Sequence, residues 1–276
     1  MVGAMFSFTI MAIAGRELYK TINTFEIMTY RSLIGIIIVV ILGYYFNTLK
    51  EINIKKIKLH VLRNLLHFFG QNCWLFAIVF IPLSQMFAFE FSTPLWIILI
   101  APIFLKERFK LSRLIAIFFG FFGVLLVSRP EITSFNIPIF AAFMCSIFFS
   151  TMTITTKILT KTESTTCILF WLTTIQAILG LICSAHSLEF NQIQGENFIY
   201  ISAISVAGLL AHFCIVSALS LAPASVVTPI EFFRLPLVII VGIILYNEKF
   251  EWEVIYGGLI ILVANIYILR KEKKQN

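Results

Sequence analysis

Long apolar runs, separated by short polar segments, recur from one end of the chain to the other. An apolar helix of about 20 residues crosses the ~30 Å hydrocarbon layer of a membrane. The pattern therefore predicts ten membrane-spanning helices. Because the first run ends in Arg16 and Lys20 without a small-residue cleavage site, we interpret it as a span rather than a removable signal peptide. The predicted spans are 1–18, 26–46, 62–81, 84–105, 113–128, 137–156, 167–185, 197–218, 225–246 and 254–269.

The composition agrees with an all-α integral membrane fold. Residues are 59% hydrophobic and only 13% charged, with a mean hydropathy of +0.96, whereas soluble domains are about 25% charged. Five cysteines are scattered through apolar runs without metal-type spacing, so we expect them to serve packing rather than a metal site or a disulfide. The net charge of +7 comes from loops and the tail, which argues against a nucleic-acid partner.

The positively charged residues gather in alternate connections between the spans. Fifteen Lys and Arg residues lie on one side, in the segments 50–63, 106–113, 157–161 and 270–274, against four on the other. The positive-inside rule then predicts that both termini are cytoplasmic in a multi-pass protein of the inner (plasma) membrane.

The chain also matches itself when it is shifted by 141 residues without a gap. Each half, 1–135 and 136–276, then holds five spans. Because five is odd, the second half must enter the membrane from the opposite side, which gives two inverted five-helix repeats. Such repeats are typical of transporters that alternate access to a site near the midplane. Matched polar and special residues include Cys73 with Cys214, Pro82 with Pro223, Ser84 with Ser225, Glu90 with Glu231, and Glu107 with Glu248.

Two segments, 80–109 and 221–250, resemble one transporter family. Each carries a Pro-bearing link, a Pro within the following span and a closing Glu. The segment FEIMTYRSL, with Arg31, resembles the start of the second span of that family. The chain thus resembles the drug/metabolite transporter superfamily in its ten-helix form with two EamA-type halves. The residues that carry the resemblance are Pro82, Pro94 and Glu107 in the first segment, and Pro223, Pro236 and Glu248 in the second.

Charged residues inside the spans are the first candidates for a functional site, since such groups are costly in a membrane unless they are paired or hydrated. Glu90 lies about six residues into its span, roughly 9 Å deep, and Glu231 lies at the mirrored depth. We expect Glu90 near the outer mouth of a central cavity, with Arg31 as its partner, and Glu231 near the inner mouth. Alternatively, Glu231 and Arg234, three residues apart, neutralise one another.

Polar, aromatic and proline residues complete the candidate site. His212 matches Gln71 under the shift, which favours a cavity-lining role, although a hydrogen bond between helices explains a lone His equally well. Prolines in corresponding spans free backbone carbonyls near the midplane, and aromatic rings can stack on a planar or cationic solute, or simply face lipid. The candidates for substrate binding or coupling are Arg31, Gln71, Trp74, Glu90, Phe91, Pro94, His212, Glu231, Arg234 and Pro236.

These features predict a secondary active transporter that moves a small organic metabolite, such as an amino acid, a cofactor or a nucleoside-like compound, with a coupling proton as an optional second partner. The chain contains no Asp, no G-x-x-x-x-G-K loop and no H-E-x-x-H, which argues against a membrane transferase, an ATPase or a zinc protease. We expect no enzyme activity, no metal and no cofactor, and either a monomer or a homodimer in the bilayer. The remaining alternative is a non-transporting membrane scaffold.

Overall fold

The computed structural model describes residues 1–105, 111–128, 136–185, 195–224, 227 and 230–273. Helices make up nearly all of these ranges, and no strand occurs within them. In chain order the elements are α1 (Val2–Leu18), α2 (Thr24–Tyr45), η1 (Leu49–Glu51), α3 (Ile57–Phe80), α4 (Leu83–Glu90), α5 (Thr93–Leu105), α6 (Leu111–Ser128), α7 (Ile137–Leu159), α8 (Thr165–Ala185), α9 (Glu196–Leu221), η2 (Glu231–Arg234), α11 (Leu235–Tyr246) and α12 (Trp252–Lys273).

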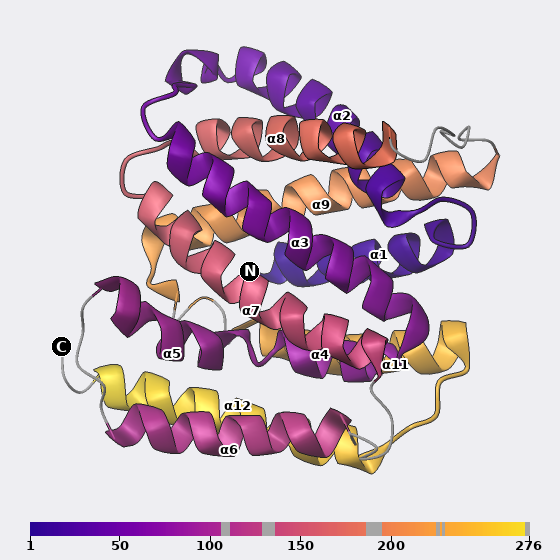
Figure 1. Ribbon diagram of the computed structural model, residues 1–276, viewed down its shortest axis with the longest axis vertical. Helices are drawn as coiled ribbons and strands as arrows, with labels where there is room; N and C mark the ends of the chain where they lie inside the picture. The colour runs from indigo at the N-terminus through magenta and orange to yellow at the C-terminus, as the bar shows by residue number, and fades with distance from the viewer. Residues whose placement is uncertain (106–110, 129–135, 186–194, 225–226, 228–229, 274–276) are drawn as a thin grey trace.

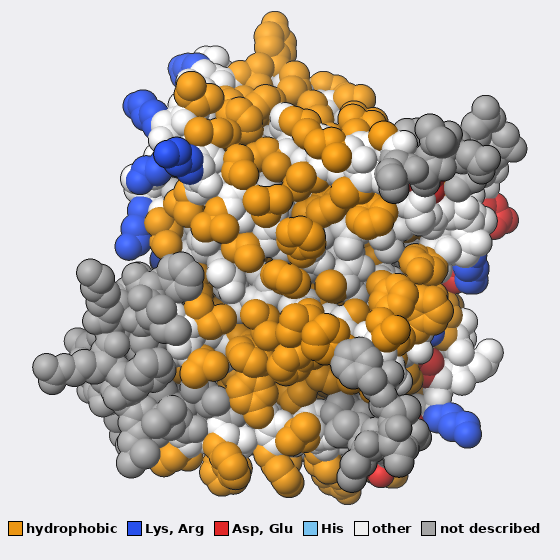
Figure 2. Space-filling view, viewed as in Figure 1, with side chains coloured by type: hydrophobic (Ala, Val, Ile, Leu, Met, Phe, Trp, Pro, Cys, Tyr) orange, Lys and Arg blue, Asp and Glu red, His pale blue; other side chains and the backbone are white. Residues whose placement is uncertain are grey.

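The surface of this bundle is apolar where a soluble protein would be polar. Ile37, Ile41, Phe118 and Ile244 are each more than half exposed. Figure 2 shows apolar side chains across the middle of the visible face, with Lys and Arg along the upper left edge and a few more beside acidic side chains at the right edge. Within the described residues, five segments are long and apolar enough to span a membrane, and α11 and most of α12 are shorter apolar helices. The chain is therefore a multi-pass membrane protein.

Helices from the first part of the chain pack against helices from the second part. α1 lies along α9, α2 along α8, α3 along α7 and α6 along α12 (Figure 1). Two of these pairs need glycine at the contact, because a Cβ on Gly180 would lie 2.4 Å from Thr29 Oγ1, and one on Gly123 would lie 2.7 Å from the backbone oxygen of Gly257. Close helix contacts through small residues are common in membranes.

The predicted span 84–105 is not one helix but two. α4 ends at Glu90, residues Phe91 and Ser92 form a turn, and α5 begins at Thr93. Pro94 explains the break, since it has no N–H to donate and its ring would collide with the carbonyl group of residue 90 in a continuous helix. In the second part of the chain, Pro236 lies in the first turn of α11, directly after η2. Both prolines therefore lie at helix starts.

Candidate functional site

A central cavity of about 50 Å³ lies where these broken helices meet α1, α3, α7 and α9. Seven of the ten candidates from the sequence line it: Gln71, Trp74, Glu90, Phe91, Pro94, His212 and Glu231. The sequence analysis did not name several other lining residues, which have no charge or special motif to reveal them. These are Phe8, Met11, Thr93, Phe149, Met152 and Ile215.

A buried ion pair forms one wall of the cavity. The guanidinium Nη2 of Arg234 donates to Glu90 Oε1 at 2.6 Å, and the indole Nε1 of Trp74 donates to Glu90 Oε2 at 2.8 Å. Arg234 Nη2 also lies 3.8 Å from Glu231 Oε2. Two carboxylates therefore share one guanidinium, and with all three groups ionised this wall carries one surplus negative charge.

Aromatic rings enclose the same guanidinium. Arg234 Cζ lies 4.5 Å from the ring centroid of Phe87, 4.8 Å from that of Phe8 and 5.6 Å from that of Phe91. Arginine over an aromatic face is attracted by the negative face of the ring, and more strongly when the contact is desolvated. The rings thus hold Arg234 between its two carboxylates.

This geometry corrects the expected partners. Glu90 pairs with Arg234 rather than with Arg31, and Glu90 and Glu231 lie at one guanidinium rather than at opposite mouths of the cavity. The expectation treated each span as a straight helix, in which depth follows residue number. The turn at Phe91 and the 3₁₀ turn η2 redirect the chain at these positions, so depth along an ideal helix does not describe them.

A pair of histidines joins α3 and α9 beside the ion pair. His67 Nε2 and His212 Nε2 lie 2.9 Å apart, and both side chains are buried. One imidazole donates to the other. The hydrogen bond between helices that was one of the two interpretations of His212 is therefore present, and His212 lines the cavity as well.

A second, smaller cavity of about 10 Å³ shares His212 in its lining. Arg31 lies here, on α2, together with Gln176 on α8 and Gly208 on α9. Pro236 lines neither cavity and its side chain is exposed, so the structure separates it from the other candidates.

The basic segment 50–63 predicted a loop position for Arg63, but Arg63 lies within a helix. It lies on α3 with 1% of its surface exposed, donates from Nε to Thr156 Oγ1 at 3.2 Å, and donates from Nη1 to Asn64 Oδ1 at 2.8 Å. α3 begins at Ile57, five residues before the predicted span, because the polar side chains of its first turns bond to α7 and α8.

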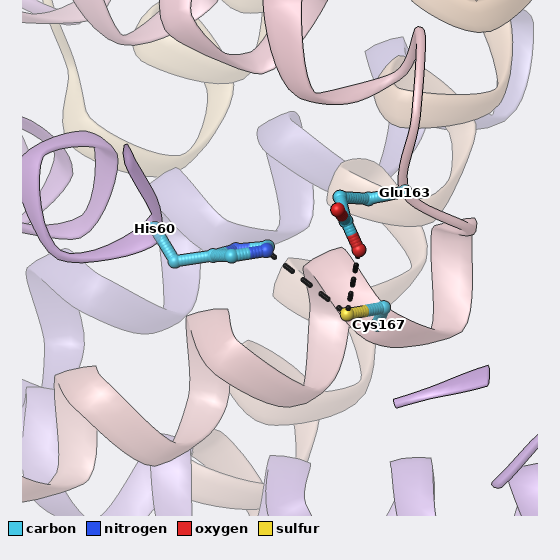
Figure 3. Close-up of side chains that lie close together, drawn as sticks. All are labelled: His60, Glu163 and Cys167. Atoms are coloured by element: carbon cyan, nitrogen blue, oxygen red, sulfur yellow. Dashed lines mark hydrogen bonds between the residues drawn. The ribbon is translucent and has the colours of Figure 1, made fainter. Parts of the chain in front are cut away.

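A polar cluster lies near the start of α3. His60 from α3, Cys167 from α8 and Glu163 from the connection before α8 point toward one another (Figure 3). The Cys167 thiol donates to Glu163 Oε2 at 3.4 Å and lies 4.0 Å from His60 Nε2, while Asn53 Nδ2 donates to the same Glu163 oxygen at 2.7 Å. Hydrogen bonds account for these contacts, so we treat the cluster as a polar link between the two parts of the chain.

Comparison with known proteins places this geometry in context. The EamA-like transporter family model matches residues 1–129 and again residues 136–270. The S-adenosylmethionine uptake transporter of Rickettsia conorii is 25% identical over 265 residues, which cover 95% of this chain and 88% of that protein. The riboflavin transporter of Brucella anthropi is 29% identical over 221 residues, covering 78% and 77%. A solved crystal structure shares the fold, with a TM-score of 0.73, 13% identity, and coverage of 100% of this chain and 96% of its own.

Proposed function

The chain belongs to the EamA-like transporter family, and we propose that this transporter moves a small organic metabolite by alternating access through the central cavity. The arrangement that carries the proposal is the wall in which Glu90 and Glu231 share Arg234. One surplus negative charge in a membrane-buried cavity needs a proton or a cationic solute for neutrality. A non-transporting scaffold has no need of such a group.

We propose that the chain has ten spans in two inverted repeats, 1–135 and 136–276. Adding 141 to the bounds of α2, Thr24–Tyr45, gives 165–186, and α8 is Thr165–Ala185. The same shift takes the end of α1 at Leu18 to residue 159, the end of α7, and the end of α3 at Phe80 to residue 221, the end of α9. The two separate matches to one family model also support this division.

The pattern of helix contacts supports the same symmetry. The shift relates α1 to α7 and α3 to α9, so a twofold operation that exchanges the halves converts the contact of α3 with α7 into the contact of α9 with α1. The pairs α2 with α8 and α6 with α12 map onto themselves. An exchange of conformations between such halves converts an outward-open cavity into an inward-open one.

The substrate that we propose to test first is S-adenosylmethionine. The R. conorii relative carries that name and aligns with 95% of this chain. The cavity also offers a surplus negative charge near the aromatic rings of Trp74 and Phe91, a combination that suits a cationic solute with a planar ring system. Riboflavin, named for the B. anthropi relative, is planar but uncharged and is the comparison solute.

Uptake into proteoliposomes tests this function. Purified protein is reconstituted, and radiolabelled S-adenosylmethionine or riboflavin is added with and without unlabelled solute or a pH gradient. We expect saturable uptake that unlabelled solute inside the vesicles accelerates, because exchange avoids the return of an empty carrier. Vesicles without protein are the control. Absence of any protein-dependent flux for either solute would contradict the proposed substrate class and favour the scaffold alternative.

For orientation we propose that both termini face the cytoplasm of the inner membrane. The exposed residues Lys55, Lys56 and Lys58 follow α2, and Lys157 and Lys161 lie at the end of α7. These connections lie at the same end of the bundle (Figure 1), which supports the assignment of this end to the cytoplasm through the positive-inside rule.

A further inference from the structure

The guanidinium of Arg31 is a buried cation for which the described part of the chain supplies no counter-charge. Arg31 is 6% exposed, and no described residue hydrogen-bonds to its Nη1. Among the described residues, no carboxylate lies within 4.0 Å of it. The other two buried arginines differ, since Arg63 donates to Thr156 and Asn64, and Arg234 pairs with Glu90. An unpaired charge in a membrane interior is strongly unfavourable and points to a partner that arrives from outside the chain.

An unused acceptor lies in the same small cavity. Gln176 Nε2 donates to the backbone oxygen of Asn64 at 2.7 Å, which fixes the orientation of the side-chain amide. Among the described residues, no group lies within hydrogen-bond distance of the buried Gln176 Oε1, although His67 is its neighbour. A cation and a free acceptor in one cavity complement a carboxylate and an ammonium group. These two groups together form the head group of an α-amino acid.

The small cavity adjoins the large one. His212 lines both. At Gly208, a Cβ would lie 3.6 Å from Arg31 Cζ and 3.5 Å from the sulfur of Met11, which lines the large cavity. The two cavities enclose only about 10 Å³ and 50 Å³ in this structure. A head group at Arg31, with its ring system beside Met11, therefore requires the helices around both cavities to separate, as alternating access does.

We propose that Arg31 binds the carboxylate of the transported solute, and that Gln176 accepts from its ammonium group. This assignment rests on the proposed function and narrows the substrate class to amino acids that carry a bulky, cationic or planar group. The remainder of the solute then lies in the large cavity, between the aromatic rings and the surplus negative charge. Arg31 thereby separates S-adenosylmethionine, which has a carboxylate, from riboflavin, which has none.

The test compares two probes that differ only in the carboxylate. Dissociation constants of S-adenosylmethionine and decarboxylated S-adenosylmethionine are measured on the purified full-length protein, wild type and the variants Arg31→Gln and Arg31→Lys. Wild type should prefer the carboxylated probe by about tenfold or more, as expected for a charge-assisted hydrogen bond. Arg31→Gln should lose that preference and keep its affinity for the decarboxylated probe. Arg31→Lys should keep part of the preference for the carboxylated probe. Lys55→Gln, at an exposed position, is the control.

Each result decides between separate claims. Equal binding of the two probes by wild type would overturn the role of Arg31 and leave the proposed transporter function standing, whatever the variants do. A preference for the carboxylated probe that survives in Arg31→Gln would also overturn the role of Arg31. Wild-type protein that binds neither probe, and moves neither in proteoliposomes, would overturn the proposed substrate and the role of Arg31 together.

Discussion

At the scale of single residues, loss of the Glu90–Arg234 ion pair should reduce the stability of the protein most. Both side chains are buried, and a charge left alone by removal of its partner costs about 3–5 kcal/mol. We expect Arg234→Gln, which leaves two carboxylates without a cation, to lower the free energy of unfolding by about that amount, and Glu90→Gln to lower it by less, because Glu231 remains beside Arg234. The double variant should lose less than the sum of the two. Chemical unfolding in detergent micelles measures all three proteins.

The matched control for that cycle is Glu90→Gln combined with Arg31→Gln. Because Glu90 contacts Arg234 and not Arg31, these two changes should add within about 0.5 kcal/mol. Coupling of Glu90 with Arg31, and none with Arg234, would contradict the pairing described above.

Glu231 is the residue whose charge should matter for transport rather than for folding. It is the more distant of the two carboxylates at Arg234, at 3.8 Å against 2.6 Å, so its removal leaves the buried pair intact. We expect Glu231→Gln to fold, to lose about tenfold or more of gradient-driven uptake, and to retain more of its exchange activity, because exchange requires no net movement of the coupling charge. Undiminished net uptake across the pH range would exclude a coupling role for this carboxylate.

At the scale of elements, Glu248 holds three helices together. Its carboxylate accepts from the backbone N–H of Leu83, at 3.1 Å and 3.0 Å, and so satisfies a free donor at the start of α4. The same group pairs with Arg16 at the end of α1 and follows the end of α11. The closing Glu of the family motif therefore has a structural role here. Its counterpart Glu107 lies outside the described residues.

We expect Glu248→Gln to destabilise the protein by about 1.5–3 kcal/mol, the range for hydrogen bonds to charged groups. Lys20→Gln, which breaks the exposed pair of Lys20 with Glu17, should change stability by less than about 1 kcal/mol. Thermal unfolding of the two variants, measured side by side with wild type, makes the comparison. Equal losses in both would mean that Glu248 contributes no more than a surface charge.

The elements also show where sequence reasoning succeeds and where it fails. Apolar length locates most helices to within a few residues, because the thickness of the membrane imposes it. The split of 84–105 into α4 and α5 depends on local backbone geometry at Phe91 and Ser92. Pro94 indicates that the helix breaks nearby, but it does not show at which residue. The pairing of Glu90 with Arg234 follows from that break. The burial of Arg63 against Thr156 and the contact of His60 with Cys167 depend on tertiary packing, which hydropathy along the chain does not describe.

At the scale of the whole molecule, the orientation in the membrane can be tested from two sides. In a cysteine-free background, cysteines introduced at the exposed positions Lys55 and Glu196 should react with an impermeant maleimide from opposite sides. We expect Lys55→Cys to be labelled only after the cells are permeabilised, and Glu196→Cys to be labelled in intact cells. The reverse pattern would place both termini outside.

The inverted repeat can be tested through its contacts, because each contact between the halves requires a second contact at the symmetry-related positions. A Cβ on Gly3 of α1 would lie 3.2 Å from the sulfur of Cys214 on α9. Shifting Gly3 forward and Cys214 back by 141 residues gives Met144 on α7 and Cys73 on α3, which is the other packed pair of helices.

Oxidation should therefore cross-link Cys214 in the variant Gly3→Cys and Cys73 in the variant Met144→Cys, with the other native cysteines replaced by serine. A protease site between the halves reports each cross-link, since the fragments then stay joined on a non-reducing gel. If transport exchanges the conformations of the halves, each cross-link should arrest uptake and a reductant should restore it. Cross-linking of Gly3→Cys alone would mean that the two contacts are not related by symmetry. Uptake that continues through both cross-links would mean that these helix pairs do not move during transport.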